Sequence, residues 1–329
     1  MPLPASLTAP LLFAVLAVFG VAGCTALVDA RADRREAEWV AAHPPVGRLL
    51  TVEGRQIHVL ETGQPRGRAR DVVLIHGANG NLRDFTFDLT GRLEDDFRVI
   101  AVDRPGLGWS DSWGDPDSDP VEQARILRAA LAQLGVEDPI VVGHSYGAAV
   151  AMGWALQAED DTAALVLLGG ATHPWEGGLG LWYRVNDTAL GAPARALVTA
   201  FAPEAAVQST LASVFAPAPV PEGYAEHFGA GLSLRRDSQA NNTRQVNALL
   251  EHVTRMQPLY AGLTLPIEVL HGDQDTIVGL EIHSRRLAAE VASAHLTVLE
   301  GAGHMPHHSH PDEVLAAIHR AAARADGQG

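Results

Sequence analysis

The stretch PIVVGHSYGAAV, residues 139–150, joins an apolar run to a series of small residues through one serine between two glycines. A G-x-S-x-G pattern on a turn from a strand to a helix lifts the serine side chain clear of the backbone. Gly143 and Gly147 leave room for such a turn, and the alanines after them allow a helix to pack closely on a sheet. The context on both sides therefore predicts Ser145 as a nucleophile.

Apolar runs that end in glycine or aspartate recur along the chain and predict strands. They cover 71–77, 97–106, 139–145, 163–170, 266–275 and 295–304. Continuous apolar runs are typical of strands covered on both faces, as in a parallel sheet. Before them, alternating residues around Glu53 and Gly54 predict a β-hairpin. Helical periodicity fills several intervals, at 121–135, 281–292 and 311–323. Alternating strands and helices predict the α/β class.

One segment, 173–264, interrupts this alternation. It holds several aromatic residues, a tract rich in proline and alanine, and helix-like runs. The runs on either side of it fit one sheet, so the simplest interpretation is a mainly helical cap inserted into a core formed by 45–172 and 265–325. Residues 1–30 form a separate N-terminal segment.

A serine nucleophile needs a base, and the base needs an acid that orients it. On a strand–turn–helix scaffold the acid and the histidine follow the serine in that order. The run VLHGDQDTIV offers Asp273 and Asp275, and LEGAGHMPHH offers His304.

With these motifs the chain resembles the α/β-hydrolases from about Leu49 to its C-terminus. The resemblance implies a mostly parallel eight-stranded sheet with helices on both faces and an inserted helical cap. The family's acid loop commonly reads G-x-x-D, which favours Asp275 as the acid and Asp273 as its turn neighbour. Its histidine commonly ends a G-x-G-H segment, which matches His304.

The same resemblance implies an oxyanion hole. Its backbone N–H donors would come from Ala78, in IHGANG, and from Tyr146, the residue after the nucleophile. Asn79 is either a loop residue with a positive φ or a substrate contact. The cap residues Trp175 and Trp182 either line an apolar substrate pocket or form the core of the cap itself.

Other histidines receive structural interpretations. The cluster of His307, His308 and His310 invites comparison with a metal site, but its spacing matches no strong ligand motif, and no metal is predicted. His144 and His76 are expected to pack beside the active-site loops. The proposed chemistry requires no cofactor.

The net charge of −15 disfavours nucleic acid and anionic lipid as partners. Residues 9–28 carry no charge and are long enough to cross a bilayer core of about 30 Å. They are interpreted as a retained anchor, a lipoprotein signal ending at the only cysteine, Cys24, or a cleaved signal peptide. Membrane attachment in a bacterial cell is the expectation. Arginines that follow the run, including Arg31, favour a cytoplasmic catalytic domain without fixing the side of the membrane.

These observations predict a serine hydrolase that acts on an apolar, small-molecule carboxylic ester through an acyl-enzyme. A carbon–carbon bond hydrolase, a lactonase, a thioesterase and a cofactor-free perhydrolase remain open, because all keep the serine. A catalytically silent ligand-binding protein is a more distant alternative. Neither the substrate's identity nor the oligomeric state can be read from the sequence.

Overall fold

One sheet of eight strands organises the chain, in the spatial order β1-β2-β4-β3-β5-β6-β7-β8. The computed structural model describes the backbone of residues 5–327 and the side chains of residues 23–327. The strands are β1 Arg48–Val52, β2 Arg55–Gly63, β3 Asp71–Ile75, β4 Arg98–Val102, β5 Ile140–His144, β6 Ala164–Leu168, β7 Ile267–Gly272 and β8 Ala294–Leu299. β2 pairs antiparallel with β1 and β4, and the remaining pairs are parallel. The predicted α/β class and mostly parallel sheet are confirmed.

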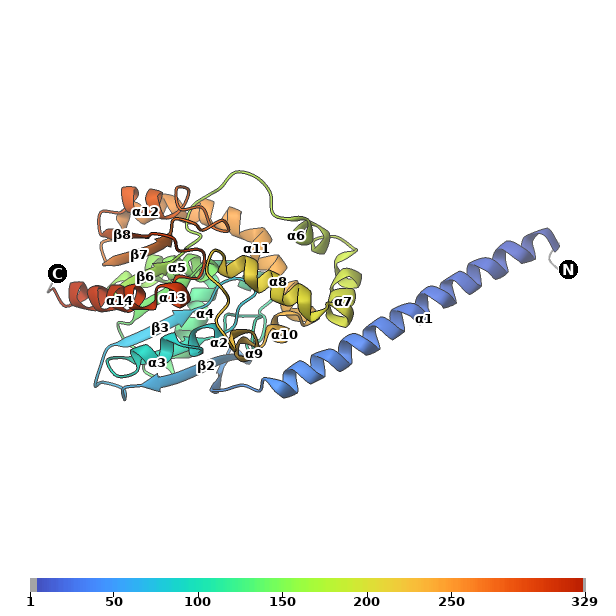
Figure 1. The fold of residues 1–329 in the computed structure, drawn as a ribbon, viewed down its shortest axis with the longest axis horizontal. Helices are drawn as coiled ribbons and strands as arrows, with labels where there is room; N and C mark the ends of the chain where they lie inside the picture. Colours follow the sequence, from blue (N-terminus) through green and yellow to red (C-terminus); the bar gives the residue numbers. More distant parts are fainter. Residues whose placement is uncertain (1–4, 328–329) are drawn as a thin grey trace.

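Helices cover both faces of this sheet (Figure 1). Apolar side chains of α4 (Pro120–Ala132), α5 (Tyr146–Ala158) and α12 (Ser284–Glu290) share one buried cluster with one side of the strands. A second buried cluster, on the other side of the strands, contains side chains of α3 (Leu89–Leu93) and α14 (Pro311–Ala325). Because alternate residues of each central strand face opposite sides of the sheet, a core on each side explains why β3 to β7 are buried at every position and mostly apolar.

The strand β8 departs from the expectation of coverage on both faces. Its residues are mostly half-buried, whereas β3 to β7 are buried throughout. β8 lies at the edge of the sheet and pairs only with β7. The helix expected over 281–292 is also shorter in the structure, because α12 starts at Ser284 and ends at Glu290.

The segment between β6 and β7 is helical, and the two strands it separates are parallel neighbours in the sheet. Its helices are α6 Leu181–Asn186, α7 Gly191–Phe201, α8 Glu204–Phe215, α9 Tyr224–Phe228, α10 Ala230–Ser233 and α11 Arg236–Met256. We refer to residues 173–264 as the cap. In Figure 1 these helices gather on the side of the sheet from which the N-terminal helix emerges.

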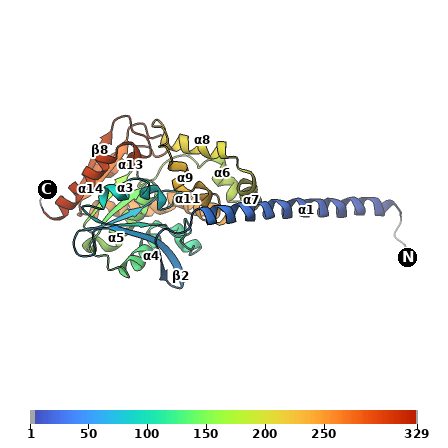
Figure 2. The same ribbon diagram turned by 60° about the horizontal axis from the view of Figure 1, so that its bottom comes forward.

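The N-terminal helix α1, Ala5–Ala42, ends against the cap and extends away from the rest of the chain (Figures 1 and 2). Arg31 Nε donates to the carbonyl of Ala200 at 2.7 Å. Arg236 of α11 pairs with Asp33 and with Glu36, whose Oε2 lies 3.0 Å from the Arg236 Nη2. The last turns of α1 are therefore attached to the cap by hydrogen bonds and ion pairs.

The apolar run at 9–28 falls mainly on residues whose side chains lie outside the described part of the chain. Within the part that is described, no helix contains a stretch long and apolar enough to cross a membrane.

Candidate active site

Ser145 stands at a sharp turn between β5 and α5. Its backbone has φ 53° and ψ −116°, a strained conformation for a residue with a side chain. Gly147 permits the turn, because a Cβ there would lie 2.1 Å from the carbonyl oxygen of Ile75. The Ser145 N–H donates to the carbonyl of Leu168 on β6 at 2.9 Å, which fixes the turn against the neighbouring strand. This is the geometry that the G-x-S-x-G sequence predicts.

His304 lies between Ser145 and Asp275. Its Nε2 is 3.0 Å from Ser145 Oγ, and its Nδ1 is 2.8 Å from Asp275 Oδ2. A carboxylate only accepts, so Nδ1 carries the hydrogen, and Nε2 is free to accept the proton of the serine hydroxyl. The structure thus brings together the three residues that the sequence predicted, with Ser145 130 positions or more before the other two, in the geometry of a Ser-His-Asp triad.

The Asp275 carboxylate is surrounded by donors. Its Oδ1 accepts the backbone N–H groups of Ile277 and Val278, at 2.8 and 2.9 Å. Burial alone would raise the pKa of Asp275, but hydrogen bonds from His271 and His304 outweigh burial and hold that pKa well below its usual range. The carboxylate therefore stays charged over the whole pH range in which an imidazole titrates.

Asp273, the other acid considered from the sequence, has a different position. It is exposed, and its Oδ1 accepts the backbone N–H of Gly301 at 2.8 Å. This contact connects the loop after β7 with the loop that leads to His304. Asp273 therefore makes a contact between two loops, as expected of the turn neighbour of the acid.

A family profile described as "Alpha/beta hydrolase family" matches residues 72–317, which is most of the chain. The chain belongs to the alpha/beta hydrolase family. It is a hydrolase, and the resemblance read from its motifs is confirmed.

Its relatives include a 2-hydroxy-6-oxononadienedioate/2-hydroxy-6-oxononatrienedioate hydrolase of Klebsiella pneumoniae subsp. pneumoniae. This protein is 26% identical over 289 residues, which cover 84% of this chain and 96% of the relative. Among solved structures, a 2-hydroxy-6-oxo-6-phenylhexa-2,4-dienoate hydrolase from Rhodococcus sp. superposes with a TM-score of 0.69 at 20% identity, covering 83% of this chain and 96% of that one. A membrane phospholipase A, described as a bacterial virulence factor, superposes with a TM-score of 0.66 at 19% identity, covering 97% and 99%.

In this alpha/beta hydrolase the loop after β3 passes directly beside the nucleophile. A Cβ on Gly77 would lie 3.0 Å from the Ser145 Cβ. Ala78, the next residue, is half-buried and packs against the core that contains α5. Tyr146 begins α5, whose N-terminal N–H groups point toward the turn. The two residues expected to form the oxyanion hole are therefore on the two segments that adjoin Ser145.

The buried side chain of Arg104 forms hydrogen bonds to the backbone of this loop. Its guanidinium donates to the carbonyls of His76 and Gly77, at 2.9 and 3.0 Å, and stacks over the Tyr146 ring at 4.2 Å from the centroid. Complete burial lowers the pKa of Arg104 to about 10, so the side chain remains a cation at neutral pH. One buried side chain thus contacts both segments that would supply the oxyanion donors.

The residues expected at the substrate side differ in exposure. Asn79 has a positive φ of 51°, and its side-chain amide lies 3.4 Å from the hydroxyl of Tyr183 in the cap. Trp175 is half-buried and packs against the core cluster of the sheet, while Trp182 is 36% exposed. Ser145 itself is only 8% exposed. Little of the nucleophile is therefore exposed to solvent.

The sequence interpretation missed three buried side chains near the triad: Asp84, Arg104 and His271. His271 immediately precedes the G-x-x-D loop, but no spacing rule distinguishes it from an ordinary strand residue. Asp84 lies in α2, Arg83–Thr86, and contacts His307 and His308 of α13, Pro306–Ser309. In the part of the chain with described side chains, Asp84, His307 and His308 are the residues that could hold a metal ion. The pairing joins positions far apart in sequence, which only the fold brings together.

Proposed function

We propose that this hydrolase cleaves a carboxylic ester through an acyl-enzyme formed on Ser145. The observation that carries the proposal is the continuous path from Ser145 Oγ to His304 Nε2, at 3.0 Å, and from His304 Nδ1 to Asp275 Oδ2, at 2.8 Å. A serine hydroxyl is a weak nucleophile, and a neutral imidazole held in this tautomer accepts its proton as the bond to the carbonyl carbon forms.

In this mechanism the backbone N–H groups of Ala78 and Tyr146 receive the developing oxyanion. Donors of this kind typically contribute about 2.7–4 kcal/mol each to transition-state stabilisation. His304 then returns the proton to the leaving alcohol, and a water molecule repeats the sequence on the acyl-enzyme. Asp275 holds the imidazole and stabilises its charged form throughout.

A carbon–carbon bond hydrolase is the second candidate, and the relatives favour it. The names of the Klebsiella and Rhodococcus proteins describe 2-hydroxy-6-oxo dienoic acids. Such compounds contain no ester or amide bond, so their hydrolysis must break a carbon–carbon bond beside the keto group. The same serine, base and oxyanion donors would serve, but the leaving carbon must be stabilised as a delocalised anion before it is protonated.

Two substrate series separate these candidates. p-Nitrophenyl esters from acetate to palmitate test ester hydrolysis, and a 2-hydroxy-6-oxo-dienoate tests carbon–carbon cleavage, each with the wild-type protein and the Ser145→Ala variant. Ester turnover that is lost in the variant supports the main proposal, and the preferred chain length measures the acyl pocket. Turnover of the dienoate alone supports the second candidate. Absence of both, together with no labelling of Ser145 by a fluorophosphonate, would leave a silent binding protein.

We also propose that residues 9–28 attach the hydrolase to a membrane. The proposal rests on their uncharged sequence and on the continuity of α1 through them. Apolar side chains exposed near the described part of α1 support it: Leu27 is 74% exposed, and Leu197 and Phe201 of α7, which packs on α1, are 51% and 53% exposed. One solved structure with this fold is named as a membrane phospholipase A.

Cell fractionation tests the attachment. The full chain should sediment with membranes after an alkaline carbonate wash, and a variant lacking residues 9–22 should not. A Cys24→Ser variant that is released would identify a lipoprotein, and one that stays bound would identify a retained helical anchor. A full chain found in the soluble fraction would contradict attachment in either form.

A further inference from the structure

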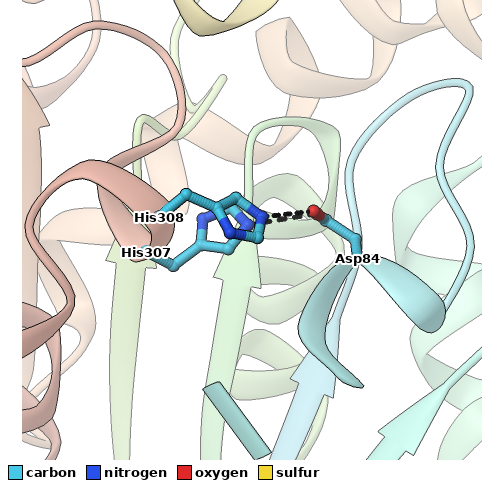
Figure 3. Close-up of side chains that lie close together, drawn as sticks. All are labelled: Asp84, His307 and His308. Atoms are coloured by element: carbon cyan, nitrogen blue, oxygen red, sulfur yellow. Dashed lines mark hydrogen bonds and ion pairs between the residues drawn. The ribbon is translucent and has the colours of Figure 1, made fainter. Parts of the chain in front are cut away.

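Three side chains that the proposed chemistry does not use lie close together (Figure 3). They adjoin the active site through His144, whose ring centroid lies 4.7 Å from that of His307 and 5.0 Å from that of His304. Asp84 Oδ2 lies 3.1 Å from His307 Nε2, and Asp84 Oδ1 lies 2.8 Å from His308 Nε2. One ligand atom from each residue lies within 4.8 Å of the other two. Asp84 is 4% exposed and His307 is fully buried. We call these three residues the Asp84 cluster.

The donor set is that of a transition-metal site. Two imidazole nitrogens and one carboxylate oxygen suit zinc and similar divalent ions, whereas magnesium and calcium prefer oxygen ligands alone. Zinc binds nitrogen at about 2.0–2.1 Å and carboxylate oxygen at about 2.0–2.2 Å, so neighbouring ligand atoms in a tetrahedron are separated by about 3.3–3.5 Å. In the structure the two histidines contact different oxygens of the Asp84 carboxylate, at 3.1 and 2.8 Å, so both contacts must lengthen and the side chains must adjust to surround an ion.

His144 provides an independent observation that points to a cation. Its Nε2 lies 2.9 Å from the carbonyl oxygen of His304, which only accepts, so Nε2 carries the hydrogen. In the neutral ring Nδ1 then has a free lone pair. This atom is buried without a hydrogen-bond partner among the described residues, and it lies 3.9 Å from the Asp84 carboxylate. Two electron-rich atoms that are buried close together repel each other unless a cation lies near both.

We propose that Asp84, His307 and His308 bind a zinc-type divalent ion, and that His144 Nδ1, 3.9 Å from the Asp84 carboxylate, faces the positive charge of that ion. Each ligating imidazole stays neutral when the hydrogen on Nε2 moves to Nδ1, and the carboxylate supplies one negative charge to the ion. The site is structural. It joins α2 to α13, the helix that follows His304 by one residue, and it takes no part in the steps at Ser145.

A competing explanation uses the same contacts without an ion. Asp84 would then accept an N–H from each histidine and the hydroxyl of Tyr224, whose oxygen lies 2.8 Å from Asp84 Oδ1. Such a carboxylate is satisfied by hydrogen bonds alone. The two explanations differ in one measurable quantity, which is the metal content of the folded protein.

The test uses the full chain in detergent, purified with a tag free of histidine. The protein is stripped with a chelator, equilibrated with zinc chloride and desalted, and bound zinc is counted by mass spectrometry. The variants are Asp84→Asn and His308→Gln. The matched control is His319→Gln. His319 Nε2 lies 3.3 Å from Asp96 Oδ2 in a more exposed pair, and among the described residues this pair has no third potential metal ligand close to it.

We expect about one zinc ion per chain in the wild-type protein and in His319→Gln, and at least about tenfold weaker binding in both cluster variants. Cobalt in place of zinc should give the strong visible absorption of a tetrahedral site in the wild-type protein only. Fluorophosphonate labelling of Ser145 verifies that each variant is folded. If Asp84→Asn does not fold, His308→Gln carries the test, because Gln can still donate a hydrogen bond to Asp84. Zinc content that is equal in the wild-type protein and His308→Gln, or absent from both, overturns the proposal without affecting the assignment of Ser145.

Discussion

His271 Nε2 lies 3.3 Å from Asp275 Oδ2, the same carboxylate oxygen to which His304 donates. His271 is itself fixed, because its Nε2 also lies 2.8 Å from the carbonyl of Val278 and its Nδ1 lies 2.6 Å from Ser284 Oγ. The acid of the proposed triad is therefore held by two imidazoles and two backbone N–H groups. So many donors keep the carboxylate ionised and prevent it from rotating away from His304.

Replacing Asp275 by Asn should lower kcat about 10⁴-fold, because an amide in this position favours the wrong tautomer of His304. The rate of ester hydrolysis and the rate of fluorophosphonate labelling both measure the loss. Asp273→Asn is the control, since Asp273 is exposed and its side chain accepts the Gly301 N–H instead of contacting His304. It should change kcat by less than about tenfold. Equal losses in the two variants would contradict the assignment of the acid.

Two buried histidines should make the protein less stable in mild acid. Burial lowers the pKa of His76 and of His283 to about 4. His283 Nδ1 accepts the N–H groups of Thr172 and His173, so protonation would break both hydrogen bonds. Between pH of about 6.5 and about 4 the unfolded chain binds more protons than the folded chain, so the free energy of unfolding falls as pH falls.

Urea unfolding at pH 7.5 and pH 5.5 measures this effect. Each of the two histidines should remove about 1.3 kcal/mol of stability over that interval. In His283→Gln, where the side-chain carbonyl can still accept hydrogen bonds, the decrease should be smaller by about that amount. An unchanged decrease in the variant would show that His283 does not titrate as described.

Gly147 should not tolerate a side chain. A Cβ at this position would lie 2.1 Å from the Ile75 carbonyl in β3, and a backbone atom in a central strand cannot move aside. Gly147→Ala should lose about 1–3 kcal/mol of stability and slow the labelling of Ser145. In Gly91→Ala the new Cβ meets no atom within 4 Å, inside helix α3, so that variant should gain up to about 1 kcal/mol. Similar unfolding midpoints for the two variants would contradict the expected collision between a side chain at position 147 and the Ile75 carbonyl.

Arg104 is predicted to be a positioning residue for the oxyanion hole. Arg104→Lys keeps the charge but loses the fork that contacts the His76 and Gly77 carbonyls. We expect kcat to fall at least about tenfold with little change in KM. This decrease should be smaller than the loss of about 10²–10³-fold in kcat that follows removal of an oxyanion donor. Arg128→Lys is the control, because the contact that Arg128 makes within the described part of the chain is a long, exposed one to Gln157. A parallel change in kcat and in the thermal midpoint would indicate a purely structural role.

The parts of the fold that follow local rules were predictable from the sequence. The strand ending at His144, the turn at Ser145 and the order of acid and histidine follow from short motifs and from continuous apolar runs. Contacts between distant segments were not predictable. Nothing in the sequence marks Asp33 and Glu36 as partners of a distant residue, whereas the structure pairs them with Arg236 of the cap.

The same limit explains the Asp84 cluster. His307 and His308 were visible in the sequence, but two adjacent histidines match no ligand spacing. Their partner Asp84 lies more than 220 positions earlier and is marked by no motif. A carboxylate that meets imidazoles across a sheet is specified by the whole topology, because α2 and α13 both follow strands that end at the same edge. A sequence motif identifies residues that are close together along the chain, and it does not identify distant residues that the fold brings into contact.

The contacts between α1 and the cap have a mechanical consequence. Arg31 donates to the Ala200 carbonyl at the end of α7. Arg236, at the start of α11, pairs with Asp29, Asp33 and Glu36, which lie on successive turns of α1. A force or a tilt applied to the far end of α1 is therefore transmitted to two cap helices before it reaches the sheet. A change in the inclination of α1 must therefore either move α7 and α11 with it or break these bonds.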